Sequence, residues 1–166
     1  PEAQCKQVLM HELFHIISRY QPKLRRELYA LIGFHPIEGP VQLGPDLQRL
    51  RLLNPDGIDT GWAIQLAPED PPPVLAQVVI HSRYAYFLPR KPHFFNYLQT
   101  DLFAMEETER GWQIGPRDAP LPQSYWEAFF ARIGDNTDYI IHPDEIMADN
   151  FVYTLLPSAK PNPSPE

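Results

Sequence analysis

The sequence predicts an α+β fold, with helices at both ends of the chain and a small antiparallel sheet inserted between them. Three observations predict it. No Gly or Pro interrupts residues 2–21, residues 61–114 are rich in β-branched and aromatic residues, and residues 143–156 begin with Pro and two acids. A chain of 166 residues holds one compact core, so we expect one domain over residues 1–156. Residues 157–166 contain four prolines and are expected to form a tail or linker.

The first half of the chain is expected to begin with two helices. Pro1 and Glu2 suit the first turn of a helix that continues until the next proline, Pro22. Residues 22–31 predict a second helix that ends at Gly33, and residues 45–53 predict a short third one. The run Asn54-Pro55-Asp56-Gly57 is typical of a turn.

The second half is expected to hold the sheet and two more helices. The predicted strands are residues 62–66, 74–83, 84–88, 94–105 and 111–114. Residues 124–133 return to helical spacing, and Gly134 follows them. The last helix begins at Pro143, with Asp144 and Glu145 in its first turn, where the helix dipole favours acids.

The first predicted helix carries the pattern His11-Glu12-Leu13-Phe14-His15. Residues four apart lie on one helix face, so His11 and His15 can bind one metal ion with Glu12 beside it. Zinc held by three protein ligands keeps a place for water and lowers the pKa of that water to about 7. Shuffling this composition produces the pattern in only about one to two per cent of sequences. The pattern therefore indicates a metal-assisted hydrolase.

Such a site needs a third protein ligand. The extended pattern HExxHxxGxxH would require Gly and His at the positions of Ser18 and Gln21, which excludes the metzincin class. A second arrangement uses a Glu on a later helix, with an Asp one turn further on. Only one Glu in the chain has an Asp four residues later, and it is Glu145 with Asp149.

With these two patterns the chain resembles the gluzincin metallopeptidases, in which HExxH is followed by a second helix carrying E-x-x-[AS]-D. The matching stretches are HELFH at residues 11–15 and EIMAD at residues 145–149. The resemblance implies one zinc ion bound by His11, His15 and Glu145, with Glu12 as general base. It also implies that the Asp149 carboxylate holds His11 in orientation.

The resemblance further implies a zincin-like fold, in which an active-site helix and a C-terminal metal-binding helix flank the inserted sheet. The separation of the two patterns is long for this class. Gluzincin catalytic domains usually place a sheet before the active-site helix. We therefore expect either an upstream part before residue 1 or a sheet supplied by the intervening segment.

Peptide hydrolysis also needs a hydrogen-bond donor for the developing oxyanion. The sequence offers several candidates for this donor or for substrate contacts without choosing among them: His81, Tyr84, Tyr86, Tyr139 and Tyr153. His142 precedes the last helix and either caps it, bridges to Asp144 or lies near the substrate.

Composition narrows the possible partners. The net charge of -7 argues against nucleic acid, and no apolar run is long enough to span a bilayer. The single cysteine, Cys5, excludes an internal disulfide framework, and it is expected to be a small buried residue. With no visible signal peptide, this favours a reducing compartment such as the cytoplasm.

The first hypothesis is a zinc-dependent metallopeptidase, which hydrolyses peptide bonds of a peptide or protein with a zinc-activated water and Glu12 as general base. The alternative is a catalytically inactive zinc-binding domain that acts as a protein-interaction module. A third hypothesis is a metal-free module in which Pro-rich stretches such as residues 70–73 bind other domains. The sequence does not predict the oligomeric state.

Overall fold

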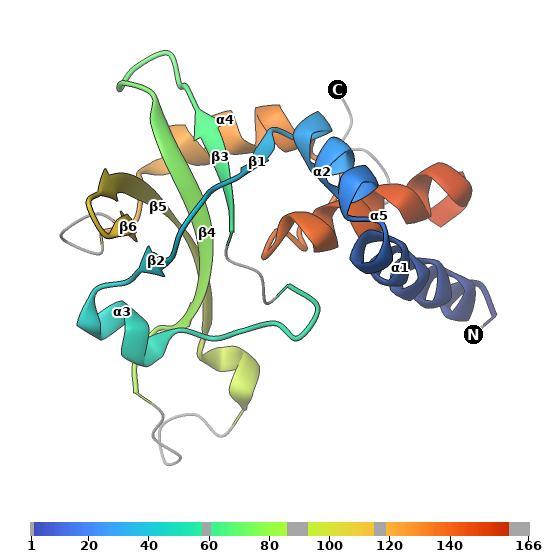
Figure 1. Ribbon diagram of the computed structural model, residues 1–166. Coiled ribbons are helices and arrows are strands. Elements are labelled where there is room, and N and C mark those ends of the chain that lie inside the picture. The colour runs from blue at the N-terminus through green and yellow to red at the C-terminus, as the bar shows by residue number, and fades with distance from the viewer. Residues whose placement is uncertain (1, 58–60, 86–92, 115–118, 160–166) are drawn as a thin grey trace.

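The computed structural model describes residues 2–57, 61–85, 93–114 and 119–159 (Figure 1). Within these residues the chain is a mixed α+β fold with five α-helices and a curled six-stranded sheet. The α-helices are α1 (Glu2–Tyr20), α2 (Pro22–Leu31), α3 (Pro45–Leu50), α4 (Gln123–Ile133) and α5 (Pro143–Leu155). The strands are β1 (Phe34–Pro36), β2 (Val41–Gln42), β3 (Trp62–Leu66), β4 (Val74–Ser82), β5 (Leu98–Thr108) and β6 (Gly111–Ile114). Two short 3-10 helices are η1 (Phe94–Asn96) and η2 (Pro157–Ala159).

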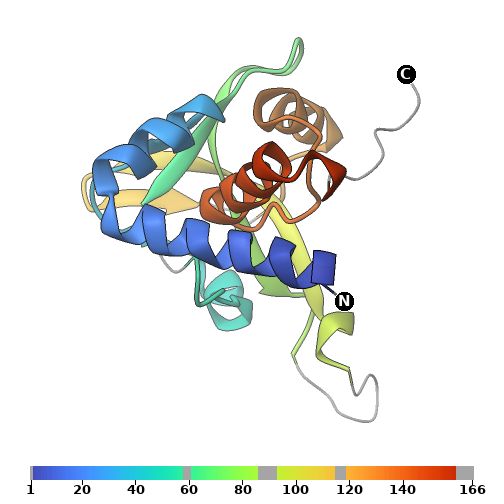
Figure 2. The ribbon, with the colours of Figure 1, turned by 90° about the vertical axis from the view of Figure 1, so that its right-hand side faces the viewer.

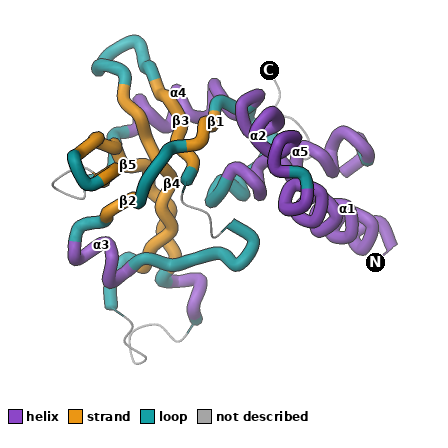
Figure 3. The backbone as a smooth tube through the Cα atoms, in the orientation of Figure 1, coloured by secondary structure: helices purple, strands orange, loops and turns teal. Residues whose placement is uncertain are grey.

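The sheet has the strand order β1-β3-β4-β5-β6-β2. Its neighbouring strands are antiparallel except β2 and β6, which are parallel, with Val41 opposite Trp112. The two edge strands, β1 and β2, follow one another in the chain and are joined only by residues 37–40. Four residues span at most about 14 Å, so the two edges must come close together. The sheet therefore curls, as the orange strands of Figure 3 show.

Each face of the sheet packs against a different apolar cluster, because side chains alternate along a strand. One face contributes Phe34, Trp62, Ile64, Leu66, Ala76 and Leu102 to a core shared with α1, α2, α4 and α5. The other face, inside the curl, contributes Ala63, Val79, Phe103, Met105 and Ile114 to a smaller core closed by Leu47 of α3. Both faces are buried, so the sheet is a rigid support for the helices packed on it.

Helices α1 and α5 lie side by side, with α2 beside both of them (Figures 1 and 2). The contact between α1 and α5 includes Phe14 and Phe151, whose rings are 5.6 Å apart between centroids. The buried residues of α1 are Phe14, His15 and Ser18, so the face of α1 that meets α5 carries a histidine of the metal pattern.

Proline and glycine set the ends of these helices. Gln21 separates α1 from α2 and has non-helical dihedrals, because the ring of the following proline makes the helical conformation unfavourable for the residue before it. Gly33 follows α2 with a φ of 85°, in the region that favours glycine, and a Cβ there would overlap the Arg132 side chain. The chain can therefore turn from α2 directly into β1.

The structure corrects several expected boundaries. The third helix ends at Leu50 rather than at residue 53, because residues 51 and 52 pair with β4 instead. Residues 94–96 form η1 and not the start of a strand, and β5 runs from Leu98 to Thr108. Strands β1 and β2 were not expected, and β2 makes the sheet mixed rather than purely antiparallel.

Two further expectations concern single segments. Tyr84 and Ala85 lie after the end of β4 and are not in a strand, while the rest of the expected strand 84–88 falls outside the described residues. Cys5 is exposed on α1 and not buried, since the buried residues of that helix, Phe14, His15 and Ser18, all lie in its C-terminal half. None of the helices within the described ranges has the length and apolar character needed to cross a membrane.

Candidate metal centre

The first turn of α5 places two neighbouring carboxylates against α1. His142 is the N-cap, and its Nδ1 accepts a hydrogen bond of 3.1 Å from the backbone N–H of Asp144. Pro143 occupies the first helical position and fixes the backbone for the turn that follows. Asp144 and Glu145 are buried, with exposed fractions of 3% and 1%. Carboxylates are rarely buried without charged or polar partners, which both find on α1.

His11, His15 and Glu145 come together between α1 and α5. His11 donates from Nε2 to Oε2 of Glu145 at 2.9 Å, and Nε2 of His15 lies 3.4 Å from the same oxygen. The two imidazole rings are edge to face, 4.7 Å apart between centroids. One ligand atom from each of the three residues lies within 4.8 Å of the others. Residues from opposite ends of the chain thus form one compact group.

The spacing of these atoms suits zinc. Zinc binds nitrogen and oxygen at about 2.0–2.1 Å in a tetrahedral arrangement, which puts neighbouring ligand atoms about 3.3 Å apart. The separations of 2.9 and 3.4 Å between the Glu145 oxygen and the two imidazole nitrogens are close to that value. Two imidazoles and a carboxylate are also the ligand set of many catalytic zinc sites.

Each histidine has a carboxylate at its other ring nitrogen. Nδ1 of His11 donates to Oδ1 of Asp149 at 3.0 Å, and the Thr137 hydroxyl donates to the other oxygen of Asp149. Asp149 therefore contacts the ring nitrogen of His11 that does not face Glu145. Carboxylates in such positions fix the orientation and tautomer of a metal-binding imidazole.

Asp144 provides the matching contact for His15. Its Oδ2 accepts from Nδ1 of His15 at 2.7 Å and from the Ser18 hydroxyl at 3.1 Å, while the Tyr29 hydroxyl donates to Oδ1. All four side chains are buried. The sequence indicated Asp144 only as an acid of the first helical turn and as a candidate partner of His142. Asp144 precedes Glu145 directly in the chain, and this position was the sequence feature that could have indicated a contact with the second histidine.

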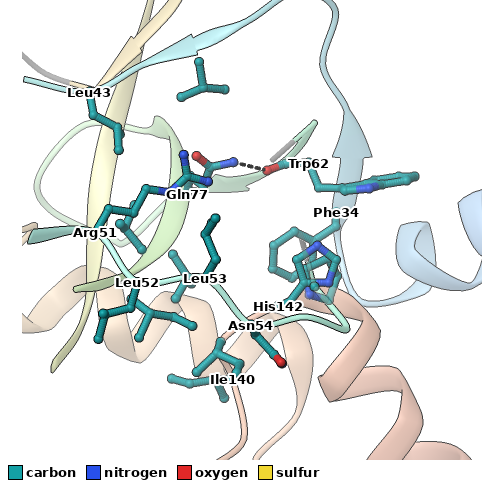
Figure 4. A pocket seen from close by; sticks show the side chains of 17 residues that line it. Phe34, Leu43, Arg51, Leu52, Leu53, Asn54, Trp62, Gln77, Ile140 and His142 are labelled. Atoms are coloured by element: carbon teal, nitrogen blue, oxygen red, sulfur yellow. Dashed lines mark hydrogen bonds between the residues drawn. The ribbon is translucent and has the colours of Figure 1, made fainter. Parts of the chain in front are cut away.

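Asn54 connects the sheet to this group. Its side-chain amide donates to Oε1 of Glu145, which leaves Oε2 for the two histidines. The segment that carries Asn54 is fixed to β4, because Arg51 forms a bridge with His81 and the Leu52 N–H donates to Ile80 at 2.9 Å. Figure 4 shows residues 51–54 in succession along one wall of a pocket between this segment and the sheet. The sequence indicated Asn54 only as a turn residue.

Hydrogen bonds shift the pKa values of the three central residues. Bonds to Asp149 and Glu145 raise the pKa of His11 to about 9. Burial opposes the charge of His15, but bonds to Asp144 and Glu145 outweigh it and raise its pKa to about 10. Burial also opposes the charge of Glu145, yet the two histidines lower its pKa to about 2. Without metal, the group is a buried cluster of imidazolium and carboxylate ions.

Glu12 lies at the open side of the group. Its carboxylate is exposed, and one atom each of Glu12, His15 and Asp56 lies within 4.8 Å of the others. Asp56 belongs to the turn after Asn54, so the sequence had indicated it only as a loop residue. A carboxylate next to a metal ligand and open to solvent can exchange protons with a bound substrate.

Two tyrosines flank the site. The Tyr139 ring is 6.2 Å from the His11 ring between centroids. Burial and the charges of Glu145 and Asp56 raise the pKa of Tyr139, although a hydrogen bond with Asn54 opposes this. Tyr153 lines a pocket with His11, Glu12 and Asp149 on the other side. Both phenols are therefore near the group, and Tyr139 is next to the residues that hold Glu145.

The other candidates have different surroundings. His81 on β4 bonds through Nε2 to Asp101 at 2.8 Å and lies against Phe103. Tyr84 packs on Tyr97, with ring centroids 5.5 Å apart, and Tyr86 lies outside the described residues. His142 caps α5 and is adjacent in the chain to the buried acids.

Comparison of the chain with protein-family models, with curated proteins and with solved structures gave no match.

Proposed function

We propose that this chain is a zinc-dependent peptidase of the gluzincin type. The observation that supports it is the group of His11, His15 and Glu145, whose ligand atoms lie within 4.8 Å of one another with Glu12 at the open side. We also propose that α1 and α5 correspond to the two metal-binding helices of a zincin-like fold. Their direct packing, with Phe14 on Phe151, supports this correspondence.

The residues around the group have distinct proposed roles. His11, His15 and Glu145 would hold the zinc ion, which when bound acts as a Lewis acid and lowers the pKa of a water molecule bound to it to about 7. Glu12 takes a proton from the attacking water at its carboxylate and passes it to the nitrogen of the leaving amine. Asp149 and Asp144 keep the two imidazoles in orientation, each through a bond to Nδ1.

Tyr139 is the proposed donor to the oxyanion. Its ring is beside His11, and its hydroxyl bonds with Asn54, the residue that holds Glu145. Burial and the negative charges of Glu145 and Asp56 raise the pKa of Tyr139, so the phenol stays protonated, as a hydrogen-bond donor requires.

Measurement of zinc and of peptide cleavage in the Glu12→Gln variant tests the proposal. We expect about one zinc per chain in both wild type and variant, because Glu12 is not among the proposed ligands. Cleavage of a library of unfolded peptides, followed by mass spectrometry, should be about 10²–10⁴-fold slower in the variant, since it lacks the general base. Glu2→Gln, on an exposed position of the same helix, should cleave like wild type.

Three other outcomes have clear meanings. Zinc without cleavage in the wild type would favour a zinc-bearing interaction module over an enzyme. A chain that binds no zinc would contradict both. Equal cleavage by wild type and Glu12→Gln would remove Glu12 from the mechanism and the gluzincin assignment with it.

A further inference from the structure

A pocket between α1, α2 and the segment that carries Asn54 adjoins the metal group, the cluster of His11, His15 and Glu145. Its wall includes Ser18, Arg19, Arg25, Tyr29, Asp56 and Asp144. Asp144 holds His15, and Asp56 lies within 4.8 Å of the nearest ligand atoms of Glu12 and His15. The pocket therefore shares Asp56 with the cluster that contains the proposed general base, and through Asp144 it is next to the His15 imidazole.

Arg25 lacks a polar partner in this pocket. Its Nε is buried and makes no hydrogen bond within the described part of the chain, and no carboxylate there lies within ion-pair distance of its guanidinium. The guanidinium lies over the Trp62 ring, 5.8 Å from its centroid, which fixes its position without satisfying its donors. A buried N–H donor without a partner is unfavourable. An acceptor that enters this pocket would satisfy that donor.

The acids of the same pocket do not supply that group. Asp144 already accepts from His15, Ser18 and Tyr29. Asp56 is 3.7 Å from Arg19, and both of these side chains are substantially exposed, so their ion pair is weak and can open. Arg19 is seven residues after Glu12, on the same side of α1. The guanidinium groups of Arg19 and Arg25 thus line a pocket whose buried acid, Asp144, already accepts hydrogen bonds from other residues.

We propose that Arg25, assisted by Arg19, binds a carboxylate of the peptide substrate. The planar guanidinium binds carboxylates through paired charge-assisted hydrogen bonds. The carboxylate comes either from the C-terminus of the peptide or from an Asp or Glu side chain near the bond that is cleaved. This inference rests on the proposed peptidase function and adds a substrate class to it.

Binding by the zinc-loaded Glu12→Gln protein tests the pocket without catalysis. Calorimetry would use acetyl-Ala-Ala-Ala as the free acid and as the amide, and acetyl-Ala-Asp-Ala-amide beside acetyl-Ala-Asn-Ala-amide. We expect the carboxylate-bearing member of at least one pair to bind about tenfold tighter. The first pair reports a C-terminal carboxylate and the second an acidic side chain. Equal affinity within both pairs would overturn the proposal.

Variants of Arg25 assign the effect to this residue. Arg25→Gln in the same background should remove the preference, and Arg25→Lys should keep only part of it, because Lys retains the charge without the planar pair of donors. The neighbouring Arg26 is exposed on α2 and outside the pocket, so Arg26→Gln should retain the preference in full. A preference unchanged in both Arg25 variants would overturn the proposal. Should Arg25→Gln fail to fold, Arg25→Lys and the wild-type pairs still decide.

Cleavage by the wild type separates this inference from the function on which it rests. If the chain cleaves peptides through Glu12 but treats acids and amides alike, the pocket proposal fails and the peptidase proposal stands. If it binds carboxylates through Arg25 but cleaves nothing, the pocket stands and the peptidase proposal fails.

Discussion

The two histidines of the metal group are held by carboxylates in unequal surroundings. Asp144 is buried and accepts from His15, Ser18 and Tyr29, whereas Asp149 is half-buried and accepts from His11 and Thr137. Burial opposes the charge of Asp144, but its three donors outweigh this and hold its pKa below the ordinary value. Asp144 is thus tied more firmly into the fold.

Replacement of these carboxylates should weaken zinc binding to different degrees. We expect Asp149→Asn to lower zinc affinity about tenfold and Asp144→Asn by more, up to about 100-fold, because loss of such partners leaves the imidazoles misoriented. Competition with a chromophoric chelator measures both. Asp135→Asn, an exposed acid elsewhere, serves as the control. Affinities equal to wild type in both variants would show that neither carboxylate supports a ligand.

Tyr139 and Tyr153 give a matched pair for the oxyanion role. Tyr139→Phe should lower kcat about 10²-fold or more, because it removes the proposed transition-state donor, and zinc content should stay near one per chain, because the three proposed ligands remain. Tyr153→Phe should change kcat much less, since the Tyr153 hydroxyl bonds with Thr137 near Asp149. Steady-state kinetics on one peptide measures both variants. A larger loss in Tyr153→Phe would move the assignment to that residue.

The segment of residues 51–57 links the sheet to the metal group. It pairs with β4 at Arg51 and Leu52 and delivers Asn54 to Glu145. The contact fixes which oxygen of Glu145 faces the histidines. The inserted sheet therefore contributes to the site through this segment, whose Asn54 amide bonds to Glu145 and whose Asp56 lies beside His15 and Glu12.

Loss of the Asn54 amide should lower zinc affinity without preventing the protein from folding. Asn54→Ala is expected to reduce zinc affinity about tenfold, because Glu145 loses the donor that orients it. Leu53→Ala, at an exposed neighbouring position, should bind zinc like wild type. Chelator competition and a thermal melt of the metal-free proteins provide the two readings. Unchanged affinity in Asn54→Ala would mean that the histidines alone orient Glu145.

The sequence predicted the elements whose first or last residues are set by a residue type within the element, such as proline at the start of a helix. Prolines at 22 and 143 mark the starts of α2 and α5, and the structure has both helices beginning there. Strands β1 and β2 were missed because they have three and two residues and exist through pairing with β3 and β6. So short a strand has no periodicity of its own to recognise.

The same distinction applies to the candidate site. His11, His15 and Glu145 belong to patterns within single helices, so sequence spacing could find them. Asn54 and Asp56 reach the group only because the sheet positions their segment, 91 residues before Glu145 in the case of Asn54. Asp144 was hidden by its ordinary place in a helix start. Contacts that depend on how distant elements pack are not encoded in local spacing.

The whole molecule should respond to pH in opposite ways with and without zinc. In the metal-free protein the pKa of His11 rises from 6.5 to about 9 and that of His15 to about 10, so their stabilising effect is complete below pH 6.5 and lost as pH rises through those values. The pKa of Glu145 falls from 4.5 to about 2, so its effect is present above pH 4.5 and lost as pH falls toward 2. The metal-free protein should be most stable between about pH 4.5 and 6.5.

Zinc bound at the proposed site should reverse the alkaline part of this dependence. It binds deprotonated imidazole, so protons compete with it for His11 and His15 more strongly at low pH. Thermal melts at pH 6.0, 7.0 and 8.5 should show the metal-free Tm falling with pH while the increase in Tm caused by zinc grows. A zinc-induced increase that is constant over this range would mean that binding releases no protons, and hence that these two imidazoles are not the ligands.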